Sequence, residues 1–365
     1  MTRTLLRFAL VGYGKVAHIH AKALNNIAGA DLVAVCGHHL GRAQTFAGVY
    51  GVSAYENLTY MIQAEEVDAV IVCTPHPAHA TAAVEAARAH VHILVEKPLA
   101  ANLSDCDAII EAARTHNVKA GVISQRRFYE PVQRIKRAID AGKIGKPVLG
   151  HVMMYGWRDK AYYDSDPWRG TWDAEGGGVL VNQAPHQLDL LQWYMGPIES
   201  LFGYWGNLNH PYIEVEDTAV AVLRFKNGGL GNILVSNAQK PGIYGKVHVH
   251  GENGASVGVQ TEGGAMFIAG MSDIQEPPFN DIWTIPGEEA SLTAWQAADR
   301  RAFEAVEPQV HYIQRQIEDF VSAIRDDRPP LVTVKAGRVT TEIFTALYRS
   351  QQTGQPVFFP VQAST

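Results

Sequence analysis

The chain has 365 residues, of which 47% are hydrophobic and 19% charged, and its formal net charge at pH 7 is -6. This composition is that of a globular protein long enough for two domains, each with its own core. The acidic balance and the lack of any Lys/Arg block argue against nucleic acid or an anionic membrane as the main partner. Small molecules are the expected ligands.

The cysteines and the N-terminus bear on the compartment. Cys36, Cys73 and Cys106 are widely separated, so they form neither a disulfide framework nor a C-x-x-C metal spacing. No export signal is visible, and no stretch approaches the roughly 18 apolar residues of a membrane span. We therefore expect a cytoplasmic protein.

In the first third of the chain, short apolar runs alternate with helical patterns. The runs cover residues 6–11, 32–36, 69–73, 92–95 and 119–124. The helical patterns cover residues 17–24, 81–89 and 104–115, the last with a capping box formed by Ser104 and Asp107. Continuous apolar strands separated by helices indicate a parallel sheet buried on both faces. We predict an α/β Rossmann-type domain over residues 1–124.

The remainder, residues 125–365, follows a different pattern. Predicted strands cover residues 148–155, 218–225, 229–236, 246–250 and 255–259, and Asn227-Gly228 is a hairpin turn signal between two of them. Helical spacing is found in residues 131–141, 179–194, 310–324 and 339–348. These elements predict an α+β domain on an open, mostly antiparallel sheet with helices on one face. The C-terminal helices are expected to pack back towards the first domain.

A glycine-rich motif lies between the first predicted strand and the first helix. The sequence G-x-G-x-x-A consists of Gly12, Tyr13, Gly14, Lys15, Val16 and Ala17. The first glycine permits a tight turn, the second lets the backbone approach a pyrophosphate, and the alanine lets helix and strand pack closely. This motif in this context predicts a dinucleotide cofactor, NAD or NADP.

The end of the second strand bears on the choice between these cofactors. An acidic residue there would bond the adenine ribose of NAD, but the chain has Gly37, His38, His39 and Arg42. Because the acid is missing and the other side chains can attract a 2'-phosphate, NADP is slightly favoured. The alternative is that these residues face solvent and that NAD binds through its phosphates.

Two more loops follow predicted strands, and the carboxyl ends of strands are where an open α/β sheet binds its ligand. One loop contains Cys73, Thr74, Pro75, His76 and His79, and the other is Glu96-Lys97-Pro98. We assign these loops, with Gln125 after the last strand of the sheet, to the cofactor site. Lys97 is expected where a nicotinamide would lie.

The chain resembles the Gfo/Idh/MocA oxidoreductase family in several motifs that occur in the right order. They are G-x-G-x-x-A, T-P-x-x-x-H ending at His79, E-K-P around Lys97, and the glycine run 176–178 followed by His186 and Asp189. The resemblance implies a Rossmann domain, an α/β domain whose open sheet often forms the contact of a homodimer or homotetramer, and oxidation or reduction of a sugar or cyclitol. It also implies that Lys97 bonds the reacting hydroxyl. The family's Asp-x-x-x-His pair corresponds here to Asn182 and His186, and the amide is a departure.

The spacing of Asn182, His186 and Asp189 places them on one face of a predicted helix, independently of any family. We expect Asp189 to bond one ring nitrogen of His186 and fix its tautomer, while the other nitrogen acts as general base. Asn182 would orient the substrate. Lys97, beside a cationic ring, is expected to have a lowered pKa and to bond the developing alkoxide.

Other candidates lie in the polar, aromatic loop before the glycine run. Its aromatic and cationic side chains suit a polyol ring, and the alternative is domain packing; they are Arg158, Tyr162, Tyr163, Trp168, Arg169 and Trp172. Arg126 and Arg127 can reach a cleft or bridge the domains. His248 and His250 share a strand face, but no third and fourth ligand has a suitable spacing, so no metal is expected.

The sequence therefore predicts an NAD(P)-dependent dehydrogenase or reductase acting on a sugar, glycoside or cyclitol. One alternative is a glycoside hydrolase that retains its NAD and acts by transient oxidation. Another is a non-catalytic dinucleotide-binding sensor, which would not need Lys97 and His186.

Overall fold

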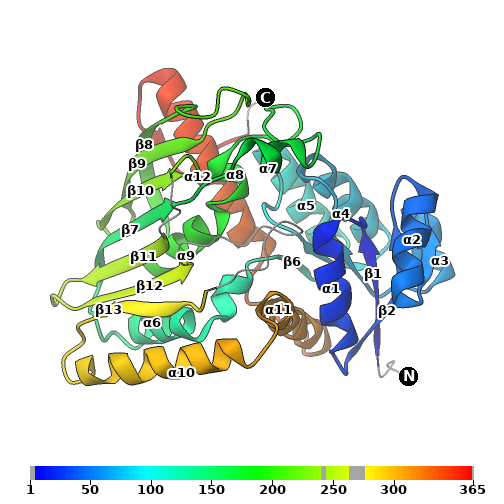
Figure 1. Ribbon diagram of the computed structural model, residues 1–365, viewed down its shortest axis with the longest axis horizontal. Helices are drawn as coiled ribbons and strands as arrows, with labels where there is room; N and C mark the ends of the chain where they lie inside the picture. The colour runs from blue at the N-terminus through cyan, green and yellow to red at the C-terminus, as the bar shows by residue number, and fades with distance from the viewer. Residues whose placement is uncertain (1–4, 240–243, 263–275, 364–365) are drawn as a thin grey trace. The chain divides into compact units, whose positions relative to one another are not determined.

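The computed structural model describes residues 5–239, 244–262 and 276–363. The chain divides into two compact units (Figure 1). The first comprises residues 1–125 together with 309–338, and the second comprises residues 126–308 together with 339–363. A segment near the C-terminus therefore belongs to the N-terminal unit, which makes that unit discontinuous in sequence.

The first unit is built on a six-stranded parallel sheet in the order β3-β2-β1-β4-β5-β6. Its strands are β1 (Leu6–Val11), β2 (Ala30–Cys36), β3 (Ser53–Tyr55), β4 (Ala69–Val72), β5 (His92–Val95) and β6 (Ala120–Val122). This is the strand order of a Rossmann dinucleotide-binding fold. The predicted fold of this region is confirmed.

The helices of this unit are α1 (Lys15–Asn25), α2 (Leu40–Tyr50), α3 (Leu58–Ala64), α4 (His79–Arg88), α5 (Leu103–Thr115) and α11 (Pro308–Arg325). The predicted capping box at the start of α5 is wrong. Asn102 is the cap, because its side chain accepts a hydrogen bond from the Asp105 N–H, and Ser104 donates to that same side chain.

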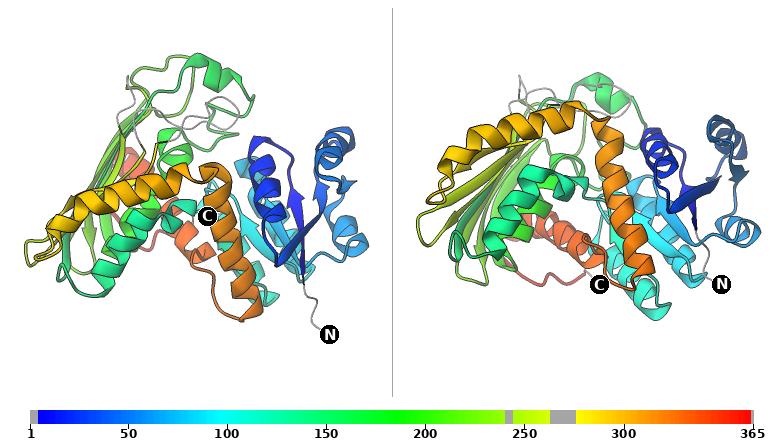
Figure 2. Two further views of the ribbon diagram at one scale, coloured as in Figure 1. Left: turned by 60° about the horizontal axis from the view of Figure 1, so that its bottom comes forward. Right: turned by 90° about the horizontal axis from the view of Figure 1, so that it is seen from below.

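Helix α11 shares the apolar core of the first unit. Ile313, Ile317 and Phe320 pack in one cluster with residues of α1 that include Ala21 and Leu24, and α11 lies beside α1 in Figures 1 and 2. Gln316, only 3% exposed, joins this helix to the end of β6. Its side chain accepts from Ser124 N at 2.9 Å and donates to Val122 O at 2.8 Å.

The second unit is built on an eight-stranded sheet in the order β13-β12-β11-β7-β10-β9-β8-β14. Its strands are β7 (Pro147–Tyr155), β8 (Ile198–Gly206), β9 (Thr218–Phe225), β10 (Leu230–Ser236), β11 (Tyr244–Gly251), β12 (Ser256–Glu262), β13 (Phe279–Trp283) and β14 (Val357–Phe358). Neighbouring strands are antiparallel except β7 and β10. Gly228, with φ +86, forms the predicted turn between β9 and β10. The expected open, mostly antiparallel sheet is confirmed.

Helices cover one face of this sheet (Figure 2). They include α6 (Glu130–Asp140), α9 (Pro185–Met195), α10 (Leu292–Glu304) and the greater part of α12 (Val334–Thr353). Helix α9 lies against β7 so closely that a Cβ on Gly150 would come within 2.6 Å of the Met195 side chain. Among the described residues, no helix is both long and apolar enough to cross a membrane.

We expect Gln316→Leu to lower the free energy of unfolding by about 2–4 kcal/mol, because it leaves a buried N–H and a buried carbonyl without partners. Gln314→Leu on the same helix is the control, since Gln314 is partly exposed and donates only to Glu318 and, weakly, to Asn26 O. Denaturant unfolding measures both. Equal losses in the two variants would contradict the role given to Gln316.

Candidate active site

The glycine-rich loop connects β1 to α1 in the first unit. Gly12 has φ +107, and a Cβ there would lie 2.6 Å from the carbonyl oxygen of Cys73, so this position tolerates no side chain. Gly14 is the N-cap of α1 and has no atom within 4 Å of its would-be Cβ. The N-terminus of α1 therefore begins beside open space at Gly14, and the N-terminus of a helix after such a loop is a place that favours a pyrophosphate.

The other residues of the motif have different surroundings. Lys15 is exposed, Val16 is half-buried and Ala17 is fully buried against the sheet. Tyr13 covers the end of β2, because a Cβ on Gly37 would lie 2.3 Å from its ring. The missing acidic residue thus has a steric reason: with Tyr13 in this place, position 37 has no room for a side chain. His38, His39 and Arg42 are exposed just beyond it.

A buried histidine joins the two loops that follow β4 and β5. His79 is fully buried, with Nδ1 2.9 Å from Pro98 O and Nε2 3.0 Å from Thr74 O. Burial lowers its pKa below the ordinary value, although both carbonyls act in the opposite direction. The assignment of His79 to cofactor contact is therefore corrected: both its nitrogens face backbone carbonyls, and it holds the loops in place.

A second buried histidine supports the Glu-Lys-Pro loop, and the sequence analysis gave it no role. His20 of α1 is fully buried, and its Nε2 lies 2.7 Å from Glu96 Oε1, while Glu96 Oε2 accepts from Lys97 N at 3.1 Å. Burial raises the pKa of Glu96, but His20 and the charge of Lys97 outweigh burial and lower it overall. Half-buried Lys97 thus follows a carboxylate fixed from both sides.

The first unit fits a dinucleotide. Besides the open space at Gly14, the buried side-chain oxygens of Thr74 and Gln125 have no hydrogen-bond partner among the described residues. Buried polar atoms of this kind point to a ligand. On the same loop, Pro75 is exposed, Cys73 is half-buried and His76 is buried. These residues would hold a nicotinamide dinucleotide at the carboxyl edge of the sheet.

In the second unit, the predicted helix over residues 179–194 is divided. Helix α8 (Val179–Asn182) ends before Gln183, and α9 begins at Pro185. Proline has no N–H and its ring clashes with the carbonyl four residues earlier, which accounts for the break at this point. The single helix face expected for Asn182, His186 and Asp189 is therefore corrected. His186 lies in the first turn of α9 and is 8% exposed.

Asp189 forms a buried ion pair that the sequence pattern did not predict. Its two carboxylate oxygens accept from Nε and Nη2 of Arg127 at 2.7 and 2.6 Å, and both side chains are about 95% buried. The Arg127 guanidinium also lies over the ring of Trp193, 4.7 Å from its centroid. Asp189 is thus the counter-ion of a buried arginine that joins the start of the second unit to α9, and its expected bond to His186 stays a prediction.

The aromatic loop forms a cluster around Tyr162 on α7 (Lys160–Asp164). Arg158 and Arg169 lie over its ring, with centroid distances of 5.2 and 4.3 Å, and Arg169 also lies over Trp168. Asn182 Nδ2 and Gln183 Nε2 each donate to its hydroxyl at 3.1 Å. Burial lowers the pKa of Arg158. The structure therefore brings Arg158, Trp168, Arg169 and Asn182 together.

Tyr163 and Trp172 pack inside the unit instead. The Tyr163 hydroxyl accepts from Asn237 Nδ2, and burial raises its pKa. Trp172 makes edge contacts with Trp205 and Tyr348, each at 5.4 Å between centroids. The contacts of these two side chains are those expected for packing within the unit, which was the alternative to substrate binding.

Two buried carboxylates near the glycine run escaped the sequence analysis. Glu216 accepts from Gly178 N and Leu180 N at 2.8 and 3.0 Å, and burial raises its pKa to about 7. A Cβ on Gly178 would lie 1.8 Å from Glu216 O, which explains the glycine. Glu175, 1% exposed, accepts from Asn182 Nδ2. The last glycine of the run thus follows from close backbone packing.

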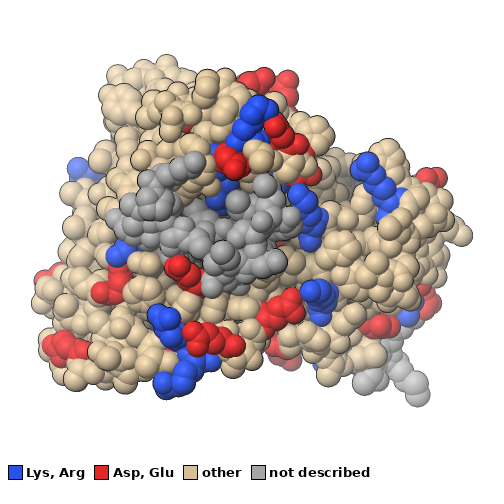
Figure 3. Space-filling view, viewed as in Figure 1, with Lys and Arg blue, Asp and Glu red and all other residues tan. Residues whose placement is uncertain are grey.

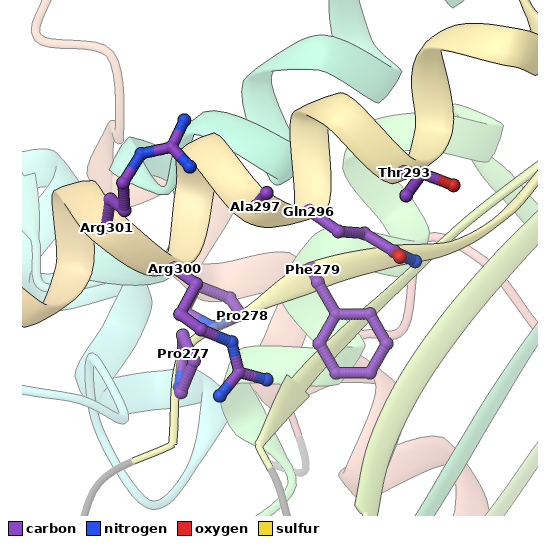
Figure 4. A pocket seen from close by; sticks show the side chains of 8 residues that line it. All are labelled: Pro277, Pro278, Phe279, Thr293, Gln296, Ala297, Arg300 and Arg301. Carbon is purple, nitrogen blue, oxygen red and sulfur yellow. The ribbon is translucent and has the colours of Figure 1, made fainter.

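Other features lie apart from these clusters. A hollow of about 430 Å³ lies between β13 and α10 (Figure 4), and none of the predicted substrate residues lines it. On the face in Figure 3, basic side chains of the described residues are interspersed with acidic ones and form no basic field. Within the described ranges, no group of three His, Cys, Asp or Glu side chains is placed to hold a metal ion.

The Rossmann sheet with its phosphate-binding loop, followed by a second unit on an open sheet, defines the class of NAD-binding oxidoreductases. A model of the oxidoreductase family with an NAD-binding Rossmann fold matches residues 6–124, and a model of the GFO/IDH/MocA C-terminal domain matches residues 132–257. The chain belongs to the GFO/IDH/MocA oxidoreductase family, and the resemblance inferred from its motifs is confirmed.

Several named proteins are similar to this chain. Myo-inositol 2-dehydrogenase of Thermotoga maritima is 32% identical over 68% of this chain and 74% of its own length. The scyllo-inositol 2-dehydrogenase (NAD(+)) of Bacillus subtilis is 26% identical over 98% of this chain and 97% of its own. The WlbA dehydrogenase of Bordetella pertussis, solved with NADH and UDP-GlcNAcA, has a TM-score of 0.86 at 28% identity and covers 99% of this chain and 100% of its own.

The two glycines of the phosphate loop are expected to differ on substitution. Gly14→Ala should leave the free energy of unfolding within about 0.5 kcal/mol of the parent, because its φ of -73 suits alanine and its Cβ meets no protein atom. It should nevertheless weaken NAD binding at least tenfold, because the Cβ would occupy the space of the pyrophosphate. Gly12→Ala should lose both stability and binding. Calorimetric titration and denaturant unfolding check this, and unchanged NAD affinity in Gly14→Ala would contradict it.

Proposed function

We propose that the chain transfers a hydride between a nicotinamide cofactor and a hydroxyl-bearing carbon of a cyclitol or sugar. The observation that carries the proposal is Lys97 on the loop after β5, at the same sheet edge as the open phosphate loop at Gly14. The similarity to inositol dehydrogenases of Thermotoga maritima and Bacillus subtilis supports the substrate class. A bound nicotinamide would supply the hydride chemistry, and the side chains supply binding and proton handling.

The proposed roles follow from the chemistry of each group. The Lys97 ammonium bonds the substrate oxygen and stabilises negative charge on it as the carbon is oxidised. The imidazole of His186 accepts the hydroxyl proton, because a neutral imidazole can act as a general base. Asn182 orients the substrate, and Arg158, Trp168 and Arg169 contact its ring face and hydroxyls. Asp189 holds Arg127 and is not assigned a part in the reaction.

The proposed cofactor range includes both NAD and NADP. The relatives support NAD, and the Bordetella structure contains NADH. Exposed Arg42, His38 and His39 beyond the side-chain-free Gly37 support acceptance of a 2'-phosphate. The three free cysteines support a reducing compartment, so we propose the cytoplasm.

A second substrate class is a nucleotide-linked sugar acid. The similarity to the WlbA dehydrogenase, solved with UDP-GlcNAcA, extends over almost the whole of both chains. Buried Arg158 and half-buried Arg169 offer guanidinium groups that suit a carboxylate. This class therefore belongs in any substrate panel.

The test is absorbance of reduced nicotinamide while inositols, aldoses, glucosides and UDP-sugar acids are offered with NAD or NADP. We expect one polyol class to be oxidised and Lys97→Ala to lower kcat/KM at least about 100-fold, because the developing negative charge loses its partner. The exposed Lys226→Ala is the control and should match the parent. Release of an aglycone without net cofactor reduction would favour the redox-assisted hydrolase, and cofactor binding without turnover of any substrate would favour the sensor.

We also propose that the chain assembles as a homodimer or homotetramer through the uncovered face of its eight-stranded sheet. Paired positions on neighbouring strands place large apolar side chains on this face, and they are strongly exposed: Leu149 42%, Tyr204 62%, Val222 62% and Leu230 52%. An apolar patch of this kind is typical of a protein interface.

Val222→Asp should shift the sedimentation coefficient towards that of the monomer, because it puts a charge in the middle of the apolar patch. Val49→Asp is the matched control, since Val49 is 67% exposed on α2 in the first unit. A parent protein that sediments as a monomer at micromolar concentration would contradict the proposed assembly.

A further inference from the structure

A buried carboxylate lies beside Asn182, the residue that departs from the family's aspartate. Glu175 is 1% exposed and comes from the loop before the glycine run. Its Oε1 accepts from Asn182 Nδ2, and its Oε2 accepts from Gly170 N at 2.6 Å. Its own backbone N–H is bonded to Thr171 O at 3.0 Å, so the carboxylate is fixed from both ends.

This contact determines which way the Asn182 amide faces. A carboxylate only accepts hydrogen bonds, so the group of Asn182 that meets it is the NH₂ and not the carbonyl. The same Nδ2 lies 3.1 Å from the Tyr162 hydroxyl. Turning the amide over would place Oδ1 against the carboxylate, oxygen to oxygen, which is electrostatically unfavourable in a buried place. The carbonyl oxygen is therefore directed away from Glu175.

We propose that Glu175 is a positioning residue for Asn182. It holds the amide so that Oδ1 of Asn182 is the acceptor in the substrate site, where it would accept a hydrogen bond from a donor such as a substrate hydroxyl. The inference rests on the proposed function. In this arrangement the carboxylate acts through Asn182 and does not touch the substrate. The amide of Asn182 cannot act as a base near neutral pH. The hydroxyl proton is therefore left to His186.

An exchange of acid and amide between the two positions tests the inference. Glu175→Gln leaves one acceptor oxygen for two donors, Gly170 N–H and the Asn182 amide, so the amide is no longer fixed, and we expect kcat/KM to fall about 10- to 100-fold. Asn182→Asp puts two carboxylates in contact, so one of them must be protonated. Its activity should fall as pH rises through this new ionisation. The double variant Glu175→Gln/Asn182→Asp restores one donor facing one acceptor, and it should recover to within a few fold of the parent without the added pH dependence.

Two controls separate this role from a merely structural one. Asp173→Asn removes an exposed carboxylate two residues from Glu175 and should leave kcat/KM and its pH profile unchanged. NMR titration of carboxyl groups gives a readout that does not depend on turnover. In Asn182→Asp one carboxyl should have its pKa raised above about 6, and in the double variant this raised value should disappear.

The inference is overturned if Glu175→Gln keeps parental kinetics, or if the double variant is no better than Asn182→Asp and both have the same carboxyl titration. If Glu175→Gln does not fold, the comparison of Asn182→Asp with the double variant still decides, because only the double variant restores the donor and acceptor pair. Failure of the parent to turn over any substrate would refute the proposed function alone. The NMR titration would then still test the contact between positions 175 and 182.

Discussion

His79 lies between two backbone carbonyls, and the geometry of the cofactor edge depends on it. The Thr74 carbonyl belongs to the loop after β4 and the Pro98 carbonyl to the loop after β5, and each is within 3.0 Å of a ring nitrogen. A protonated ring can donate to both carbonyls, whereas a neutral ring donates to one. Burial lowers the pKa of the ring, and the two carbonyls act in the opposite direction. His20 and Glu96 hold the same edge from α1, and Lys97 follows directly from this framework.

The fold of the first unit was predictable because its signals are local. Strands buried on both faces must be continuously apolar. The G-x-G-x-x-A motif predicts the turn between the first strand and the first helix. The structure differs where two local signals compete. Ser104 matched the pattern of a helix N-cap, but the N-cap of α5 is Asn102, two residues earlier. Pro185 was included in a helical pattern, although its missing N–H divides that helix into α8 and α9.

The site was less predictable, because its contacts join residues that are far apart in the sequence. His20 and Glu96 are 76 positions apart, and Arg127 and Asp189 are 62 apart. Helical spacing predicts that Asp189 lies on the same helix face as His186, but it does not predict which cation contacts Asp189 in the folded chain. The buried guanidinium of Arg127 needs a counter-ion, and two short bonds to the Asp189 carboxylate supply it. Similarly, Glu216 and Tyr13 explain Gly178 and Gly37 through close packing that no motif reveals.

The amide at position 182 is best understood together with Glu175. Two ionised carboxylates cannot lie in contact in a buried place, so an aspartate at 182 would force one of the pair to be protonated. An asparagine removes the conflict: its NH₂ satisfies the carboxylate, and its oxygen keeps the acceptor that an aspartate would offer. What it gives up is the capacity to take a proton. The asparagine at 182 and the buried glutamate at 175 thus depend on each other, because the amide neutralises what would otherwise be a contact between two carboxylates. A chain that lost Glu175 would no longer have this physical reason to keep the amide.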